Sequence, residues 1–200
     1  VSGMTIDGLV SVSIPAGAAT DTAGNDSFAS SSTDNSVEFL DAEGPSVDEV
    51  NTSDDTGDGI LSESEVVIVG VNQFTVKFSQ DVFNPAGDTD LNDVTNSANY
   101  ILVRERDGNT GFQTVSCSAG VDPADIEFPL TVISYASNIV TFRISNGLDL
   151  IDGNYRLYVC GTTSIVDPLD NTLALVGNNG PATDFIRNFI VKLPIGGGGG

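Results

Sequence analysis

The sequence contains no histidine and no tryptophan, and only seven of its 200 residues are lysine or arginine. Without histidine the chain has no imidazole for a Ser-His-Asp or Cys-His catalytic site or for a metal centre. With 28 acidic residues, carboxylate pairs at glycosidase spacing arise by chance. Without tryptophan, aromatic stacking on a sugar would depend on Tyr100, Tyr135, Tyr155 or Tyr158. We therefore expect no enzyme.

Long hydrophobic runs are also missing, so we expect no membrane-spanning segment. The 28 acidic residues stand against seven basic ones and give a formal net charge of −21. This charge repels phosphate backbones and anionic lipid headgroups, so nucleic acid and direct membrane insertion are not expected. In a folded chain, so high a density of carboxylate charge must be hydrated, screened by salt, or neutralised by bound cations. Solubility alone and calcium binding in Asp- and Gly-rich loops are both open interpretations.

Cysteine occurs only twice, at Cys117 and Cys160. An even pair in a chain that otherwise looks extracellular favours one disulfide, which closes a long loop and contributes about 4 kcal/mol in the chain-entropy model. Two buried free thiols are the alternative. The chain starts with Val1 and has no basic and apolar leader, so either a signal has been removed or the chain is an internal fragment, and we favour the fragment.

Apolar and polar residues alternate with a period of two in several short runs, and helical periodicity is essentially absent. The runs lie at residues 10–14, 37–39, 74–78, 140–144, 155–159 and 189–193. Clusters of Gly, Asn, Asp and Pro separate them, as turns require. The pattern predicts an all-β fold, an antiparallel sandwich.

The end of the chain repeats the order of parts found at its start: an Asp-Gly pair, a strand, and then a loop aspartate. The loop aspartate follows the first one by 14 residues near the start, from Asp7 to Asp21. It follows by 15 residues near the end, from Asp152 to Asp167. Chance is an unattractive explanation for two spacings this similar.

This repeat sets the predicted domain organisation. Residues 1–43 correspond to the C-terminal half of one repeat, and residues 45–193 to a complete one. Gly44 and Pro45 mark the joint, because proline fixes φ where glycine frees it. Residues 194–200, which end in five glycines, are expected to form a flexible tail.

Both units resemble a known family. Residues 1–35, reading VSGMTIDGLVSVSIPAGAATDTAGNDSFASSSTDN, resemble the end of the bacterial Ig-like repeats that occur in tandem in very large adhesins and surface proteins. Residues 74–82 (FTVKFSQDV), 98–103 (ANYILV) and 152–171 (DGNYRLYVCGTTSIVDPLDN) are similar to the Ig-like domain of S-layer proteins. The resemblance implies an immunoglobulin-like β-sandwich. It implies function only broadly, because such repeats serve as stalks, lattice elements and spacers.

A half repeat cannot enclose a core, because two or three strands leave their apolar side chains in water. Either the remaining strands precede residue 1, or another molecule supplies them by strand exchange, as in donor-strand polymers. Expected partners are therefore neighbouring Ig-like repeats or copies of the chain itself, with surface glycans as a further candidate.

The most specific motif reads DDTGDGILSESE over residues 54–65. Ligand positions 1, 3, 5, 7, 9 and 12 of the calcium loop of an EF-hand fall, in this order, on Asp54, Thr56, Asp58, Ile60, Ser62 and Glu65. Gly59 takes the turn position. The flanking residues are typical of strands rather than of paired helices, so an ordinary acidic loop is the alternative.

A second, weaker oxygen cluster is formed by Asp88, Asp90 and Asp93. It lacks the glycine turn, so a solvated loop is the alternative to a cation site. Two further pairs recur in the two repeats, Asp21 with Asn25 and Asp167 with Asn171. A short Asx-type turn explains both without a metal.

Taken together, these features predict a non-enzymatic, extracellular structural or adhesive module of a bacterial surface protein, with calcium making its acidic loops rigid. A subunit of an extracellular filament or S-layer that assembles by strand exchange is one alternative. An accessory carbohydrate-binding module is another.

Overall fold

The computed structural model describes residues 8–39, 41–52, 57–87, 90–106, 111–113, 116–168 and 173–194. The chain divides into two compact units, unit 1 (Val1–Ala42) and unit 2 (Glu43–Gly200). The predicted flexible tail lies outside the described residues, apart from Pro194.

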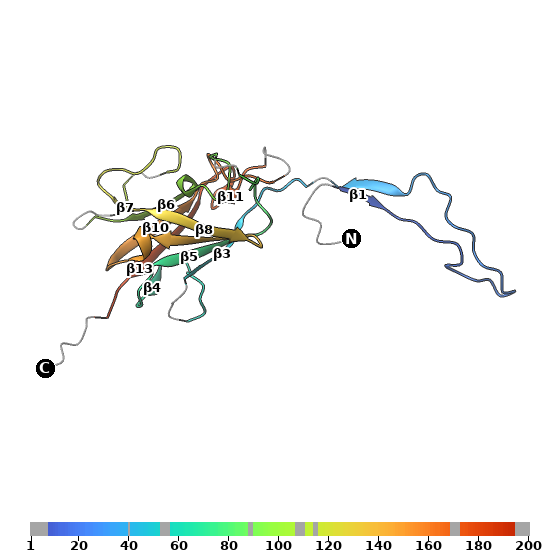
Figure 1. The fold of residues 1–200 in the computed structure, drawn as a ribbon, viewed down its shortest axis with the longest axis horizontal. Helices are drawn as coiled ribbons and strands as arrows, with labels where there is room; N and C mark the ends of the chain where they lie inside the picture. Colours follow the sequence, from blue (N-terminus) through green and yellow to red (C-terminus); the bar gives the residue numbers. More distant parts are fainter. Residues whose placement is uncertain are drawn as a thin grey trace. The chain divides into compact units, whose positions relative to one another are not determined.

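Unit 2 consists of two main sheets (Figure 1). The five-stranded sheet has the order β4 (Glu65–Val67), β13 (Phe185–Val191), β10 (Gly153–Val159), β6 (Tyr100–Arg104) and β7 (Ile126–Phe128). The four-stranded sheet has the order β3 (Val47–Thr52), β5 (Gln73–Phe78), β9 (Ile139–Ile144) and β8 (Leu130–Ala136). A small hairpin joins β11 (Val176–Gly177) to β12 (Gly180–Pro181).

Helix is limited to two short 3₁₀ turns in the described part of the chain, η1 (Ser97–Asn99) and η2 (Ser145–Gly147). The prediction of an all-β chain is confirmed. Among the described residues, no helix has the length and apolar character needed to cross a membrane.

Strand pairing is antiparallel in both sheets with one exception. β4 lies parallel to β13, with Val66 opposite Ile190. The antiparallel sandwich that the sequence predicts therefore has one parallel pair, at this edge. Bulges interrupt the two edge strands of the four-stranded sheet, between Val47 and Glu49 in β3 and between Val132 and Ser134 in β8. Bulges and short strands are devices that protect sheet edges from further pairing.

The core lies between the two sheets and follows from the period-two alternation. In β5, for example, Phe74, Val76 and Phe78 are buried while Thr75 and Lys77 alternate with them. Aromatic rings join the sheets. The Phe74 ring meets the Phe189 ring edge to face at 5.6 Å, and the Tyr100 and Phe142 ring centroids lie 4.3 Å apart. Unit 2 is therefore a closed β-sandwich with its own core.

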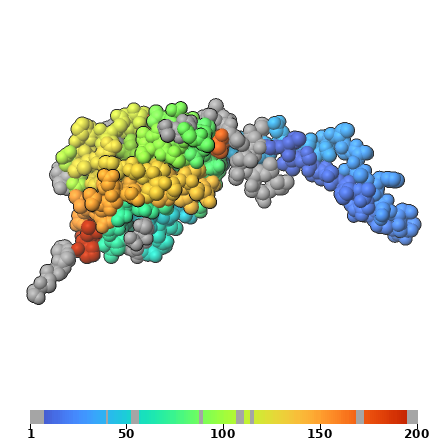
Figure 2. All heavy atoms as spheres, viewed as in Figure 1, coloured from blue at the N-terminus to red at the C-terminus, as the bar shows by residue number. Residues whose placement is uncertain are grey.

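Unit 1 is a two-stranded antiparallel ribbon built from β1 (Gly8–Ser11) and β2 (Ser36–Phe39). Backbone hydrogen bonds extend it beyond the strands, from Val12 N to Asn35 O at 2.8 Å and from Ser30 N to Ile14 O at 2.9 Å. Figure 2 shows the atoms of residues 8–39, in blue, as a narrow band on the face drawn.

The tip of the ribbon is an Asx-type turn. Asp21 Oδ1 accepts hydrogen bonds from the backbone N–H groups of Asn25 at 2.9 Å and Ala23 at 2.8 Å. The hydrogen bond from the Asn25 backbone N–H is the main cause that lowers the pKa of Asp21, and the other hydrogen bonds of the turn lower it further. The turn predicted for the first repeat is thus present and is closed by protein groups.

The register gives the ribbon two unlike faces. Val10 lies opposite Val37, whereas Leu9 lies opposite Glu38. Because successive side chains of a strand point to opposite sides, the valines share one side with Val12 and Phe39. We call these four residues the apolar ribbon face. Its residues Val12 and Val37 are 64% and 65% exposed, so the ribbon lacks the core that unit 2 has.

Candidate cation sites and the disulfide clamp

The predicted calcium loop connects β3 to β4. Its first ligands, Asp54 and Thr56, lie outside the described residues. In the second half, Asp58 Oδ1 accepts a hydrogen bond from Ile60 N at 2.9 Å, and Ile60 forms a bridge with β3. Leu61 then enters the core, with its N–H donating to the Val50 carbonyl at 2.7 Å. This half of the loop therefore turns back tightly and forms hydrogen bonds with β3.

The last two predicted ligands, Ser62 and Glu65, belong to one turn. Glu65 Oε2 accepts a hydrogen bond from Ser62 N at 2.7 Å, while the Glu65 backbone belongs to β4. Neighbouring Glu63 reaches β13, where its Oε2 accepts from Asn188 N at 3.0 Å. These carboxylates therefore have structural hydrogen bonds, and the loop is flanked by strands rather than by the paired helices of an EF-hand.

The second predicted cluster contains a buried carboxylate. Asp88 lies outside the described residues, and Asp90 is exposed. Asp93 is only 1% exposed. Its Oδ1 accepts hydrogen bonds from the backbone N–H and the hydroxyl of Thr95, both at 2.6 Å. Its Oδ2 is buried and has no hydrogen-bond partner.

Asn99, which the sequence analysis did not single out, completes this region. It ends η1 and is fully buried, and its Nδ2 donates to the Asp93 carbonyl at 2.7 Å. Its Oδ1, like Asp93 Oδ2, is buried without a partner. No sequence signal marks this asparagine, because it follows an ordinary serine-alanine pair and precedes a strand.

Two tyrosines border the same region. The Tyr100 hydroxyl donates to the Val94 carbonyl at 2.8 Å. Burial raises the pKa of Tyr100 well above its usual value, and the nearby negative charges of Tyr135, when ionised, and of Asp93 raise it further. Burial also raises the pKa of Tyr135, whose hydroxyl donates to Asp81.

A cavity of about 240 Å³ opens beside Tyr135 and is also lined by Pro168 and residues 81–85. Its wall residue Phe83 accepts a hydrogen bond from Val94 N at 3.0 Å, one residue from Asp93. Residues 78–103 contain four aspartates and no lysine or arginine. Acidic groups therefore dominate this end of unit 2.

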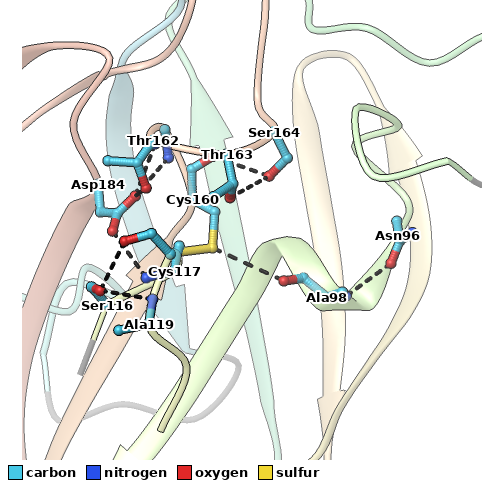
Figure 3. The surroundings of a disulfide bond; sticks show 12 residues. Asn96, Ala98, Ser116, Cys117, Ala119, Cys160, Thr162, Thr163, Ser164 and Asp184 are labelled. Atoms are coloured by element: carbon cyan, nitrogen blue, oxygen red, sulfur yellow. Dashed lines mark hydrogen bonds between the residues drawn. A yellow bond between two sulfur atoms is a disulfide. The ribbon is translucent and has the colours of Figure 1, made fainter.

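A disulfide joins Cys117, in the segment between β6 and β7, to Cys160 at the end of β10 (Figure 3). The Asp184 carboxylate points between the two segments (Figure 3). Its Oδ2 accepts from Cys117 N at 3.2 Å, and its Oδ1 accepts from Gly161 N at 3.1 Å and from the Thr162 hydroxyl at 2.7 Å. We call Cys117, Cys160 and Asp184 the disulfide clamp.

The packing beside the clamp also explains why residue 161 is glycine. A Cβ on Gly161 would lie 2.1 Å from the carbonyl oxygen of Thr183, so no larger residue fits without moving the backbone. The local sequence does not indicate the role of Asp184, because its partners lie 67 and 23 residues away along the chain.

Beside the clamp is a second, smaller apolar cluster. It is formed by Ile101 and Val103 of β6 and Tyr158 of β10, with Phe112 and Val121 packed against them. The latter two belong to the segment between β6 and β7, which the disulfide holds to the end of β10. The clamp therefore fastens a cover over one side of the five-stranded sheet.

The tyrosines considered for sugar stacking do not form an exposed platform. Tyr100, Tyr155 and Tyr158 are all buried, and only Tyr135 is partly exposed. Phe112 is also partly buried, with the Arg156 guanidinium 4.4 Å from its ring centroid. Phe112 lines a cavity of about 220 Å³ together with Glu105, Asn154 and Asn188, among other residues.

No protein-family model matches the sequence, and no curated protein matches it. Among the described residues, no group of three or more His, Cys, Asp or Glu side chains has an arrangement that could hold a metal. The function is therefore inferred from the geometry of the chain itself.

Proposed function

We propose that the chain is a non-enzymatic structural or adhesive module of a bacterial surface protein. The observation that carries this proposal is the apolar ribbon face, in a chain whose other unit is a closed sandwich. An exposed apolar surface on a folded ribbon is typical of a protein interaction site. A ribbon of this kind suits a chain of modules in which each unit is completed by a neighbouring β-sheet.

Several features support an Ig-like module outside the cell. Two sheets with a shared core and a parallel pair at one edge fit the resemblance to tandem Ig-like repeats. A disulfide is stable in oxidising compartments and rare in the cytosol. In this proposal calcium binds the acidic loops and makes them rigid, which also reduces the repulsion within a chain of net charge −21.

The location is tested on intact cells of the organism that encodes the chain. An antibody raised against residues 43–194 is expected to label the cell surface without permeabilisation, because the proposed module works outside the cell. Fluorescence of intact and lysed cells measures this. An antibody against a cytosolic protein is the control, and labelling confined to lysed cells would contradict the proposal.

The apolar ribbon face also favours a second candidate, a filament subunit that assembles with copies of itself. In this case, Val37→Lys is expected to reduce self-association at least about tenfold, because a lysine on the apolar ribbon face must be desolvated at the contact. Sedimentation velocity over a range of chain concentrations measures the effect.

Leu9→Lys is the matched control for this experiment. Leu9 is 69% exposed, close to the 65% of Val37, but lies on the opposite face of the ribbon. Equal effects of the two variants, or a monomeric wild type at every concentration, would rule out assembly through this face and leave the module as the remaining reading.

A further inference from the structure

Two buried oxygen atoms in the acidic end of unit 2 lack a hydrogen-bond partner, Asp93 Oδ2 and Asn99 Oδ1. Both are acceptors, so the group each one lacks is a donor or a cation. Their residues are linked, because Asn99 Nδ2 donates to the Asp93 carbonyl at 2.7 Å. Buried polar atoms without a partner are rare in folded proteins, and a bound ion or water is a common reason for them.

The charge of Asp93 favours an ion over water. Its side chain is 1% exposed, and no lysine or arginine among the described residues pairs with it. A buried carboxylate is costly unless it is paired or coordinates a metal. The surrounding residues 78–103 supply three more aspartates and no basic side chain. Water would satisfy the two lone pairs but would leave this charge uncompensated.

We propose that Asp93 Oδ2 and Asn99 Oδ1 bind one Ca²⁺ ion beside η1. Calcium takes carboxylate, amide and carbonyl oxygens together and tolerates irregular geometry, so one carboxylate and one amide oxygen can be part of such a site with carbonyl oxygens and water. This inference rests on the proposed calcium role and assigns it to residues other than the predicted loop 54–65.

The site would stiffen more than its own loop. The Asn99 carbonyl accepts a hydrogen bond from Cys160 N at 2.9 Å, which connects η1 to the disulfide clamp. Asp93 is connected in turn to Val94, whose N–H donates to the Phe83 carbonyl at 3.0 Å. An ion between Asp93 and Asn99 therefore ties three loops at one end of the sandwich together.

The test uses the full chain, freed of metal with a chelator and then titrated with CaCl₂ while its melting temperature is measured. Calcium is expected to raise the melting temperature of the wild type, because a ligand that binds only the folded state stabilises it. Asp93→Asn is expected to abolish most of this rise, since it keeps the Oδ1 acceptor for Thr95 but removes the charge and the second oxygen lone pairs. Asp48→Asn makes the same change of charge at an exposed residue of β3, outside both candidate loops, and is expected to keep the rise.

A second measurement tests the site even if Asp93→Asn fails to fold. Tb³⁺ replaces Ca²⁺ and emits when a nearby aromatic side chain transfers energy to it, and this chain has no tryptophan. Tyr100 lies beside the site, since its hydroxyl binds the Val94 carbonyl. Tyr135 borders the same region. The double variant Tyr100→Phe and Tyr135→Phe is therefore expected to remove most of the sensitised emission, whereas Tyr155→Phe keeps it.

The outcomes separate the site from the wider function. Calcium that stabilises the wild type and Asp93→Asn equally, or emission unchanged in the double variant Tyr100→Phe and Tyr135→Phe, would overturn the site and leave calcium binding elsewhere in the chain. No effect of calcium on the wild type would overturn both the site and the proposed calcium role. Neither result bears on the surface location, which the antibody experiment tests.

Discussion

Replacing Cys117 and Cys160 together with alanine is expected to lower the free energy of unfolding of unit 2 by about 4 kcal/mol. The disulfide closes a loop between residues 43 positions apart, and opening this loop gives the unfolded chain more conformational freedom. For a unit of this size, the melting temperature falls by on the order of 10 °C. Differential scanning calorimetry measures the change.

Reduction provides the control for this prediction. A reductant is expected to lower the melting temperature of the wild type as much as the double substitution does, and to leave the substituted chain unchanged. Because Cys117 also holds the cover over Ile101, Val103 and Tyr158, we expect dye binding to newly exposed apolar surface in the same samples. A double variant that melts at the wild-type temperature would contradict the role given to the clamp.

Phe74→Ala is expected to cost about 3–5 kcal/mol of stability, the second large effect. Phe74 is fully buried, and its ring meets Phe189 of the opposite sheet at 5.6 Å. Its removal takes away buried apolar area and leaves a cavity at the contact between the sheets. Urea unfolding followed by circular dichroism measures the loss.

Leu148→Ala is the matched control. It also removes a large apolar side chain, but Leu148 is 70% exposed, so the change is expected to stay within about 0.5 kcal/mol. Similar losses for the two substitutions would show that the sheets are not held together by this core.

The sequence predicted the strands that have a strict period of two. Residues 74–78 and 140–144 alternate cleanly, and each lies in a strand whose apolar side chains are buried. In residues 155–159, Tyr158 is buried as well, in the second apolar cluster. The reason is physical, because a strand with one side in a core must place apolar residues at every second position. The short strand β4 is different. The apolar run at residues 66–71 is longer than the strand, which ends at Val67.

Strand partners could not be predicted in the same way. Nothing in residues 65–67 indicates that they pair in parallel with β13, more than 100 residues later, because pairing depends on the path of the whole chain. The same holds for Asp184, which meets Cys117 and Gly161 only after folding. Asn99 was missed for a related reason. Its importance comes from complete burial and an unpartnered oxygen, and neither property can be read from local sequence.

The parallel edge has a consequence for a module in a tandem array. Ser46, before β3, bridges Val176 in β11, whose neighbour Gly177 lies against Asp184 just before β13. Phe74, opposite the end of β3, meets Phe189 late in β13. The chain thus enters unit 2 at one end of the strands and leaves at the other. Tension on both ends would load β3 against β5, and β13 against β4 and β10, in shear, so the hydrogen bonds of each pair must break together rather than one after another. Such a unit would resist stretching more strongly than its thermodynamic stability alone implies.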